Sequence, residues 1–475
     1  MSLTVLHTSD WHLGRLLYGR SRDSEFESFL QWLLETIRRR QVDVLLVAGD
    51  VFDSSTPTHQ AQTLYYRFLS AVSLTACQHV VIIGGNHDSP TLLNAPQELL
   101  KALHVHVIGQ ALRPEDEVLV LYDADQCPQL IVAAVPYLRE RDVRQVHSGE
   151  SLEEKAAGYV HGVEQYYTEI AEQALACQQE LEKKVPIIAM GHLFTAGGYT
   201  QSDDGVRDVI VGGLGHIRPQ LFDQVFDYVA LGHLHVPQRV GQRDWVRYSG
   251  SPLPMGFGEA QQQKSVCLIQ IKNADKPEST PQDSMPSGAV TKSQSKPTSA
   301  DNLALADNTA FSDNVTPADS LPPAEQKQWE WQRLQHQFKV QLLPVPVFQR
   351  LRRIEGDWTQ IEAQILAYKR KLESIWLEII YTGDEVVGEL RARVSELIED
   401  SPLEVLRLQN QMLMREILAP VQAEKPLPEL TPYEVFERRL EALQVASEQR
   451  AELLHTYGEA LQLLEEEQPT EEAES

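Results

Sequence analysis

The chain has 475 residues, 42% of them hydrophobic, and a formal net charge of −26. This length predicts two or three domains with sizeable cores, and the acidic balance argues against bulk electrostatic binding of nucleic acid, because Lys and Arg supply the affinity for phosphates. A nuclease stays possible, since metal ions or a partner subunit can supply positive charge locally.

The first part of the chain, residues 1–272, alternates apolar strands with helical patterns, which is typical of an α/β layer fold. A helix is predicted over residues 24–40, between strands at 3–10 and 42–50. Its apolar residues recur at i, i+3, i+4, i+7, i+8 and i+11, and its end carries three arginines. A capping box is expected at its start, formed by Ser24 and the glutamate three residues later.

Residues 273–328 differ in composition from the rest of the chain. They are rich in Pro, Ser, Thr, Asp and Ala and show little periodicity. Such a segment cannot bury enough apolar surface to offset the entropy lost on ordering. We predict a disordered linker or insertion, with a short binding motif inside it as the alternative.

Residues 329–420 predict a small α+β capping domain with three strands and two helices. The strands are expected at 338–345, 374–382 and 403–409, and the helices from about 358 to 372 and from about 385 to 398.

The remaining residues, 421–475, predict C-terminal helices and an acidic tail. A broken apolar stripe runs along them, formed by Phe436, Leu440, Leu443, Leu454, Tyr457, Leu461 and Leu464. The stripe is explained either by packing against the surface of this chain or by a site for a partner helix.

Membrane and secreted classes are disfavoured. No apolar run approaches 18 residues, and the first residues lack the basic and apolar regions of a signal peptide. The four cysteines are scattered without a C-x-x-C pair, which favours free thiols in a reduced cytoplasm.

Five apolar strands of the first part end in residue types that bind metal ions. In chain order these are Asp10 and His12, then Asp50 and Asp53, then Asn86, His87 and Asp88, then His192, and finally His233 and His235. The functional crevice of an open α/β sheet lies at the carboxyl ends of its strands. Each match alone would more often be a turn, a common strand exit or a surface histidine, but their joint occurrence predicts a metal site.

The ligand types narrow the choice of metal. Carboxylate, imidazole and amide oxygen without thiolate suit Mn²⁺, Fe²⁺ or Zn²⁺ better than Ca²⁺ or thiolate-bound zinc. Asp50 is the natural bridging carboxylate. Two cations about 3.5–4 Å apart acidify a bridging water and stabilise an in-line displacement at phosphorus. The histidines without a strand-end position are expected to be structural or surface residues; they include His59, His79, His104, His106, His161, His336 and His455.

The motif series D-x-H, G-D-x-x-D, G-N-H-D, G-H and G-H-x-H resembles the calcineurin-like metallophosphoesterase superfamily. The stretches LHTSDWHLG, VAGDVFDSSTP, GGNHDSP, DYVALGHLH and YSGSPLPMGFGE are similar to the SbcD family of bacterial nucleases. Later stretches, SIWLEIIYTGDE, SPLEVLRLQ and LTPYEVFERRL, resemble the capping domain and C-terminal helices of that family. The resemblance implies a β-sandwich flanked by helices, and the insertion at 273–328 departs from it.

The resemblance also implies roles for the strand-end residues. One ion would be held by Asp10, His12, Asp50 and His235, and the other by Asp50, Asn86, His192 and His233. His87 would sit over the scissile phosphate, where it stabilises charge or protonates the leaving oxygen. Asp88 would orient the His87 imidazole, with a turn or helix cap as the alternative. Asp53 is expected to stabilise its loop and receives no catalytic role.

The activity implied by the resemblance is metal-dependent DNA cleavage. It comprises 3′→5′ exonuclease activity on duplex DNA and endonuclease activity at hairpins and blocked ends, with two divalent ions, expected to be Mn²⁺, as cofactors. The implied partner is the coiled-coil ATPase SbcC, docked near 431–465. Two copies of each subunit and self-association through the nuclease domain are expected. This chain has no G-x-x-x-x-G-K-[ST] loop, so the partner would bind the ATP.

Three alternatives stay open at this point. The loop at 14–23, with Arg15, Tyr18, Arg20 and Arg22, is either a DNA-backbone contact or a solvated loop. A phosphatase on the same fold is disfavoured, because such enzymes usually read G-D-x-x-D-R-G and G-N-H-E where this chain reads GDVFDSS and GNHD. A catalytically silent scaffold is disfavoured by the complete ligand set.

Overall fold

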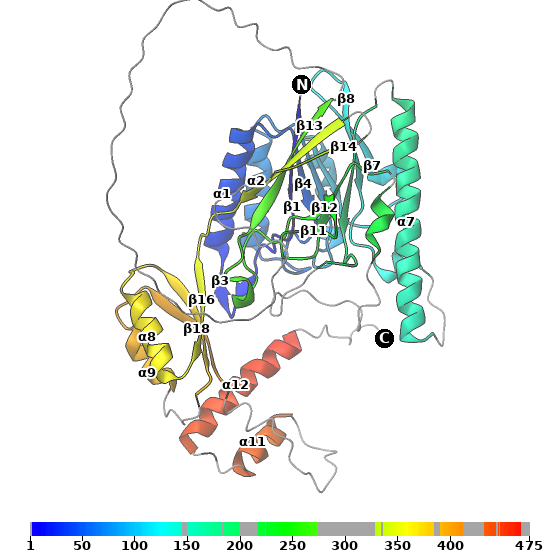
Figure 1. Cartoon of the computed structure of the whole chain (residues 1–475). Helices are drawn as coiled ribbons and strands as arrows, with labels where there is room; N and C mark the ends of the chain where they lie inside the picture. Colours follow the sequence, from blue (N-terminus) through cyan, green and yellow to red (C-terminus); the bar gives the residue numbers. More distant parts are fainter. Residues whose placement is uncertain are drawn as a thin grey trace, which may run out of the picture.

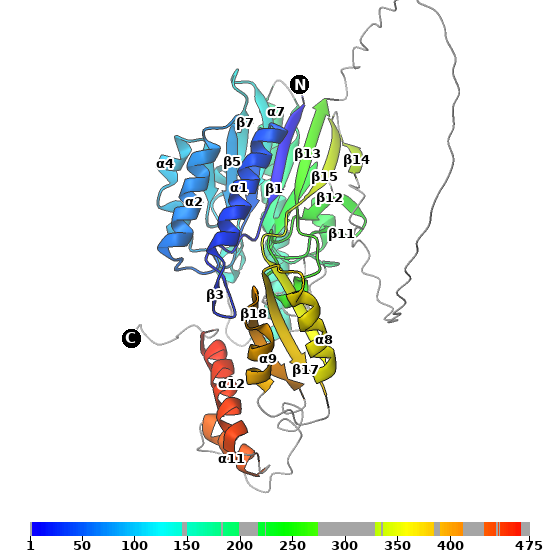
Figure 2. The ribbon, with the colours of Figure 1, turned by 90° about the vertical axis from the view of Figure 1, so that its left-hand side faces the viewer.

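The computed structural model contains two stacked sheets with helices outside them, and a smaller unit beyond one end of the sheets (Figures 1 and 2). It describes residues 2–144, 150–181, 184–198, 217–223, 225–273, 328–333, 336–383, 390–411, 432–442, 445 and 447–466. The predicted linker at 273–328 lies, apart from its two end residues, outside the described residues.

The first sheet has the strand order β14-β15-β13-β1-β4-β5-β6. Its strands are β1 (Leu3–Thr8), β4 (Val44–Ala48), β5 (His79–Ile83), β6 (Val105–Ile108), β13 (Ser265–Asn273), β14 (Gln328–Arg333) and β15 (His336–Pro344). Strands β1, β4, β5 and β6 run parallel to one another. Strand β13 pairs antiparallel with β1 and with β15, and β15 pairs antiparallel with β14. The carboxyl ends of β1, β4 and β5 therefore meet at one edge of this sheet.

The second sheet has the order β11-β12-β10-β9-β8-β7. Its strands are β7 (Val118–Tyr122), β8 (Pro128–Ala134), β9 (Ile187–His192), β10 (Tyr228–Gly232), β11 (Gln238–Val240) and β12 (Arg243–Tyr248). Strands β8, β9, β10 and β12 run parallel. Side chains of both sheets interleave in one buried layer that includes Leu46, Ile83, Ile188 and Met190. Burial on both faces explains why these strands read as nearly continuous apolar runs.

The helices cover the outer faces of the two sheets (Figure 1). Helices α1 (Asp23–Arg40) and α2 (His59–Val72) pack on the first sheet, and α7 (Leu152–Glu180) packs on the second. The short helical segments are α3 (Pro90–Asn94), α4 (Gln97–Lys101), α5 (Pro114–Glu117), α6 (Glu140–Val143), η1 (Pro219–Phe222) and η2 (Phe257–Glu259).

The predicted capping box of α1 is wrong. The helix starts at Asp23, and its N-cap residue is Arg22, which makes no side-chain cap. Instead, the buried Arg22 guanidinium donates to both carboxylate oxygens of Glu25 and to the carbonyl of Pro254. A local ion pair between residues three apart therefore lies at the start of this helix, and the same guanidinium also binds the distant backbone of Pro254, a contact that sequence spacing does not reveal.

The small unit is a three-stranded parallel sheet with two helices. Its elements are β16 (Arg350–Gly356), α8 (Trp358–Lys369), β17 (Ile375–Tyr381), α9 (Leu390–Ile398) and β18 (Leu403–Asn410). Strands and helices alternate along the chain, so this is a β/α arrangement rather than the expected α+β one. The strand predicted at 338–345 also belongs elsewhere, because β15 pairs with β13 in the first sheet. The small unit therefore begins near residue 350 rather than at 329.

The loop at 14–23 forms the hairpin β2 (Leu16–Leu17) and β3 (Arg20–Ser21), which contacts the small unit. Leu17, Phe257, Leu351 and Trp376 form a shared apolar cluster. Tyr18 stacks on Phe257, and its hydroxyl accepts a hydrogen bond of 3.0 Å from Arg407.

The charged side chains of this loop are also engaged within the chain. Arg20 pairs with Glu404, and Arg15 pairs with Asp53. The structure thus uses the loop to join the two units, which neither sequence alternative anticipated.

The C-terminal helices are α11 (Pro432–Ala442) and α12 (Ser447–Glu466). Phe436 stacks on Tyr457 with 4.0 Å between ring centroids, and Leu440 is fully buried beside Leu454. The apolar stripe predicted here is thus used at least partly between the two helices themselves. Among the described residues, no helix is long and apolar enough to cross a membrane.

Candidate metal centre

Seven predicted ligand residues converge at the carboxyl ends of strands from both sheets. Asp10 and His12 follow β1, Asp50 follows β4 and Asn86 follows β5, while His192 ends β9 and His233 and His235 follow β10. All of them are buried except Asn86, which is partly exposed. The two halves of the site therefore come from two different sheets, and packing of these sheets brings the halves together.

The backbone at this site is unusual. Four of the seven residues have positive φ angles: Asp10 at 52°, His12 at 48°, Asp50 at 49° and His233 at 100°. Non-glycine residues rarely adopt such angles, and where they occur they concentrate at functional sites. The chain thus accepts local backbone strain to direct these side chains inward.

Gly85 is required by close approach rather than by a special φ angle. A Cβ at Gly85 would lie 2.1 Å from Oδ1 of Asp50 and 2.3 Å from its backbone nitrogen. Any larger residue would displace Asp50. The glycine pair that opens GGNHD thus lets β5 pass directly beneath the central carboxylate.

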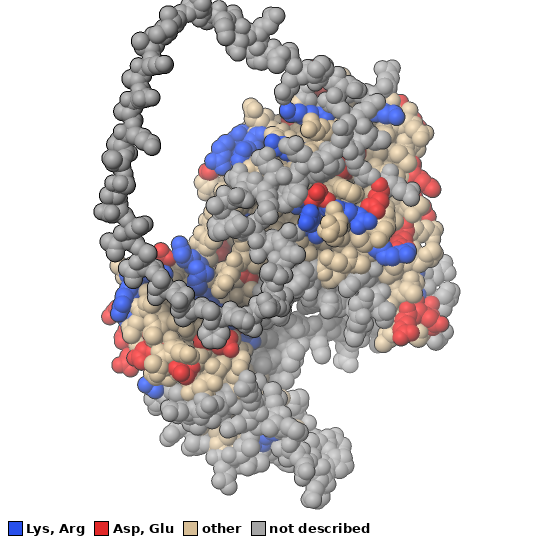
Figure 3. All heavy atoms as spheres, viewed as in Figure 1, with Lys and Arg blue, Asp and Glu red and all other residues tan. Residues whose placement is uncertain are grey.

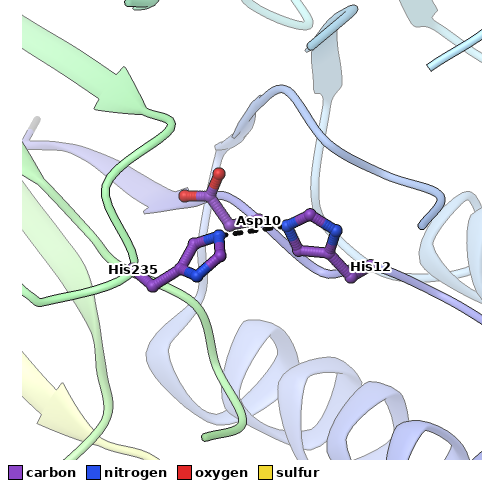
Figure 4. Close-up of side chains that lie close together, drawn as sticks. All are labelled: Asp10, His12 and His235. Atoms are coloured by element: carbon purple, nitrogen blue, oxygen red, sulfur yellow. Dashed lines mark hydrogen bonds between the residues drawn. The ribbon is translucent and has the colours of Figure 1, made fainter. Parts of the chain in front are cut away.

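Asp50 is the central residue of the site. Its Oδ2 lies 3.2 Å from Nε2 of His192 and 3.6 Å from Nε2 of His12. His12 and His235 bring their Nε2 atoms to 3.2 Å of each other, and Figure 4 shows both rings beside the Asp10 carboxylate. On the other side, Oδ1 of Asn86 lies 3.0 Å from Nε2 of His192 and 3.1 Å from Nδ1 of His233.

These separations fit the binding of divalent cations. Two donors bound to one ion at about 2.0–2.2 Å lie about 3.0–3.5 Å apart, depending on the geometry. The donor atoms of Asp50, His12, His235, His192 and Asn86 approach one another at such distances. Asp10, His12 and His235 form one group of potential ligands, and Asp10, Asp50 and His192 form another.

The pKa values of the site residues are shifted by burial and by the neighbouring charged groups. Burial, together with the neighbouring Asp50, raises the pKa of Asp10 to about 7. Burial alone would lower the pKa of His192, but the charge of Asp50 raises it to about 9. Burial and His192 together lower the pKa of His233 to about 3. Protons on Asp10 and His192 thus offset the negative charge, and bound metal ions would replace such protons.

Two of the ligand histidines, His192 and His12, are oriented by oxygen atoms next to their Nδ1 atoms. Nδ1 of His192 donates to the backbone carbonyl of Ala48 at 2.9 Å, and Nδ1 of His12 lies 3.2 Å from Oδ1 of Asp53. Such contacts leave Nε2 free to bind a metal ion. Asp53 contacts Nδ1 of His12, whereas His235 contacts Nε2, and Asp53 also pairs with Arg15. The sequence placed Asp53 in the motif but did not reveal this contact.

His87 and Asp88 do not interact as the sequence suggested. Nδ1 of His87 donates to the backbone carbonyl of Asp53 at 2.8 Å, and its backbone nitrogen donates to Oδ1 of Asp50. The Asp88 carboxylate instead accepts from the backbone nitrogens of Val51, Phe52 and Gly85.

The direct contact expected between Asp88 and the His87 ring is therefore absent from the described hydrogen bonds. Asp88 instead binds the backbone nitrogens of Val51 and Phe52, which directly precede Asp53, and the carbonyl of Asp53 binds the His87 ring. In all, the Asp88 carboxylate binds three backbone N–H groups. The sequence does not indicate which backbone groups lie near a side chain.

Comparison with known proteins agrees with this geometry. Residues 3–237 match the family described as calcineurin-like phosphoesterase. Residues 347–444 match the family described as type 5 capsule protein repressor C-terminal domain, named SbcD_C. The first match contains all seven predicted ligands, and the second contains the small unit and the first of the C-terminal helices.

Similar proteins extend over both parts. The chain is 32% identical over 464 residues, 97% of its length, to the SbcD protein of the SbcCD nuclease from Escherichia coli K12, and covers 98% of that protein. The corresponding protein of Rhodobacter capsulatus is 36% identical over 59% of this chain and 69% of its own. That of Bacillus subtilis is 35% identical over 57% and 66%. The chain therefore belongs to the SbcD family, within the calcineurin-like phosphoesterases.

Proposed function

We propose that this protein is the DNA-cleaving component of an SbcCD-type complex and hydrolyses phosphodiester bonds with two divalent metal ions. The observation that carries the proposal is the convergence of seven carboxylate, amide and imidazole ligands, six of which have donor atoms 3.0–3.6 Å from the next one, while the seventh, Asp10, groups with His12 and His235 and with Asp50 and His192. Membership of the SbcD family supports a nucleic-acid substrate, since the relatives are named as nucleases, and we propose DNA as that nucleic acid.

The proposed ligand sets follow the two sides of Asp50. Asp10, His12 and His235 would bind one ion with Asp50, and Asn86, His192 and His233 would bind the other with Asp50. When bound, two such ions would supply an activated water nucleophile and positive charge for the phosphate. The mixed oxygen and imidazole donors without thiolate fit Mn²⁺, Fe²⁺ or Zn²⁺, and among these Mn²⁺ is proposed from the resemblance to the family.

His87 is proposed as the residue that contacts the scissile phosphate. Its Nδ1 donates to the carbonyl of Asp53, so Nδ1 carries a proton and Nε2 is the nitrogen left to act on substrate. A protonated Nε2 would donate to a phosphate oxygen and pass its proton to the leaving oxygen. Asp88 supports this role by holding residues 51–53, which carry that carbonyl.

The DNA-binding surface is proposed to depend on the metal ions and the partner. Figure 3 shows Lys and Arg interspersed with Asp and Glu on the described surface in that view, rather than gathered on one face. With a net charge of −26, this chain gains little affinity from long-range attraction to phosphates. A partner of the SbcC type would supply ATP-dependent binding of duplex DNA. The proposed complex has two copies of each component.

The proposed activities are 3′→5′ exonuclease cleavage of duplex DNA and endonuclease cleavage at hairpins and blocked ends. The test is to incubate the purified chain with an end-labelled DNA hairpin and Mn²⁺, with and without SbcC and ATP. Cleavage at the hairpin that SbcC and ATP stimulate is expected. Turnover of an aryl phosphate ester without any DNA cleavage would assign the site to a phosphatase instead.

Deletion of residues 431–475 is expected to separate cleavage from partner binding. The described helices α11 and α12 in this segment pack on each other through Phe436 and Tyr457, and the catalytic residues lie in the first part of the chain. Mn²⁺-dependent cleavage should therefore persist while co-purification with SbcC is lost. Retained co-purification would place the docking site elsewhere.

A further inference from the structure

A buried ion pair lies directly behind the proposed metal ligand His235. Glu259, the last residue of η2, has a fully buried side chain, and Lys264 is 3% exposed. Nζ of Lys264 lies 2.5 Å from Oε2 of Glu259. The same ammonium donates to the backbone carbonyl of His235 at 2.9 Å and to the hydroxyl of Ser251 at 3.1 Å.

The two oxygens of Glu259 have different surroundings. Oε2 accepts from Lys264 and from the backbone nitrogen of Met255. Oε1 is buried without a hydrogen-bond partner among the described residues, and it lies 3.8 Å from Nδ1 of His235. Burying a carboxylate oxygen without a hydrogen-bond donor costs free energy. A hydrogen bond from a nearby N–H would remove this cost.

The His235 ring is placed to supply that donor. Its Nε2 lies 3.2 Å from Nε2 of His12, on the metal side of the ring, so Nδ1 points toward Glu259. A neutral imidazole carries one proton, and a proton on Nδ1 leaves a lone pair on Nε2. His12 and His192 also have an oxygen near Nδ1, at shorter distances: Oδ1 of Asp53 at 3.2 Å and the carbonyl oxygen of Ala48 at 2.9 Å.

We propose that Glu259 is a positioning residue for His235, to which no motif or comparison assigns a role. The 3.8 Å between Oε1 and Nδ1 is longer than a hydrogen bond, and a small shift of the ring would let Oε1 accept the Nδ1 proton, which selects the tautomer that binds metal through Nε2. Lys264 holds the carboxylate and the backbone carbonyl of His235 at once, so side chain and backbone of the ligand are fixed together. The inference rests on the proposed ligand role of His235.

The test is calorimetric titration of Mn²⁺ into the full-length protein and its Glu259→Gln variant, without DNA. In this variant the amide oxygen would pair with Lys264, so the amide N–H₂ would face the Nδ1 proton of His235. Loss of such an outer partner typically weakens metal affinity about 10–100-fold. We expect this loss at one of the two sites and unchanged affinity at the other.

Glu25→Gln is the matched control. Glu25 is also a buried carboxylate, paired with Arg22, which donates to Pro254 in the same stretch of chain as Glu259. The control carries a comparable cost in stability without contact to a proposed ligand, so it should bind both ions as the unchanged protein does. If Glu259→Gln and Glu25→Gln bind Mn²⁺ equally well, the inference is wrong.

A second variant covers the case in which Glu259→Gln does not fold. Glu259→Asp keeps the charge beside Lys264 but withdraws the oxygen from His235 by one methylene. It should melt near the temperature of the unchanged protein and still lose affinity at one site, and normal affinity at both sites would overturn the inference. Tight binding of two ions by an unchanged protein that cleaves no DNA would overturn the proposed function alone.

Discussion

Replacing Asp50 with alanine is expected to abolish metal-dependent cleavage, with a loss of at least about 10³-fold in rate, because metal ions contribute several kcal/mol to such reactions. Asp50 is the residue whose carboxylate lies near both His12 and His192, at 3.6 and 3.2 Å. Without it, both proposed ions lose their shared ligand. Mn²⁺ titration and hairpin cleavage measure the two effects separately.

The fold should survive this substitution. Asp50 crowds a second buried carboxylate, and its charge contributes to the raised pKa of Asp10. Its removal relieves this repulsion but also removes its contacts with His12 and His192, so thermal melting beside the unchanged protein checks that the variant is folded. Asp43→Ala is the matched control, because Asp43 precedes the same strand at the opposite end of the sheet and accepts from the backbone of Thr4. Cleavage retained by Asp50→Ala would refute its role as the bridging ligand.

Replacing His87 with alanine is expected to lower the rate of cleavage about 10²–10⁴-fold, the usual contribution of general acid–base catalysis, and to leave metal binding intact. The contact of His87 with Asp50 is made by its backbone nitrogen, which alanine retains. The ring itself is tied to the carbonyl of Asp53. The ligand carboxylate thus keeps its hydrogen bond in the variant while the proposed proton donor disappears.

The control for this prediction is His79→Ala, since His79 begins β5 and His87 follows its other end. This variant should cleave at the normal rate once corrected for folded protein. Calorimetry decides the alternative role of His87: a lost Mn²⁺ site in His87→Ala would make it a ligand. His87 does belong to one compact group of potential ligands, with His12 and Asp53.

The site could be predicted from the sequence because its residues share a simple relation to secondary structure. Each of the five motifs follows an apolar run, and the carboxyl ends of parallel strands meet at one edge of a sheet. The strands β1, β4, β5, β9 and β10 form as expected, and their order in the sheets brings the motifs together.

The failures involve contacts that sequence spacing does not encode. Ser24 does not cap the helix, which begins one residue earlier at Asp23, after a buried Arg22 that binds the distant carbonyl of Pro254. The Asp88 carboxylate accepts hydrogen bonds from three backbone nitrogens rather than from the ring of its neighbour His87. Glu259 lies in a stretch whose only sequence signal is its similarity to the family. Each of these roles depends on which backbone or side-chain group lies nearby in three dimensions.

Domain assignment fails at one strand for a similar reason. The run at 338–345 lies after the linker and directly before the small unit, so its position along the chain favours the small unit. Its partner is β13, which lies before the linker, and the nine residues from Ser265 to Asn273 pair with β15 throughout. Antiparallel pairing across a long connection leaves no local signal.

The most direct test of the two-metal centre is anomalous diffraction at the manganese edge from crystals of the full-length protein grown with Mn²⁺. We expect two peaks about 3.5–4 Å apart, one beside Asp10, His12 and His235 and the other beside Asn86, His192 and His233, with Asp50 between them. A single peak, or a peak held by His12, Asp53 and His87, would contradict the two-metal centre.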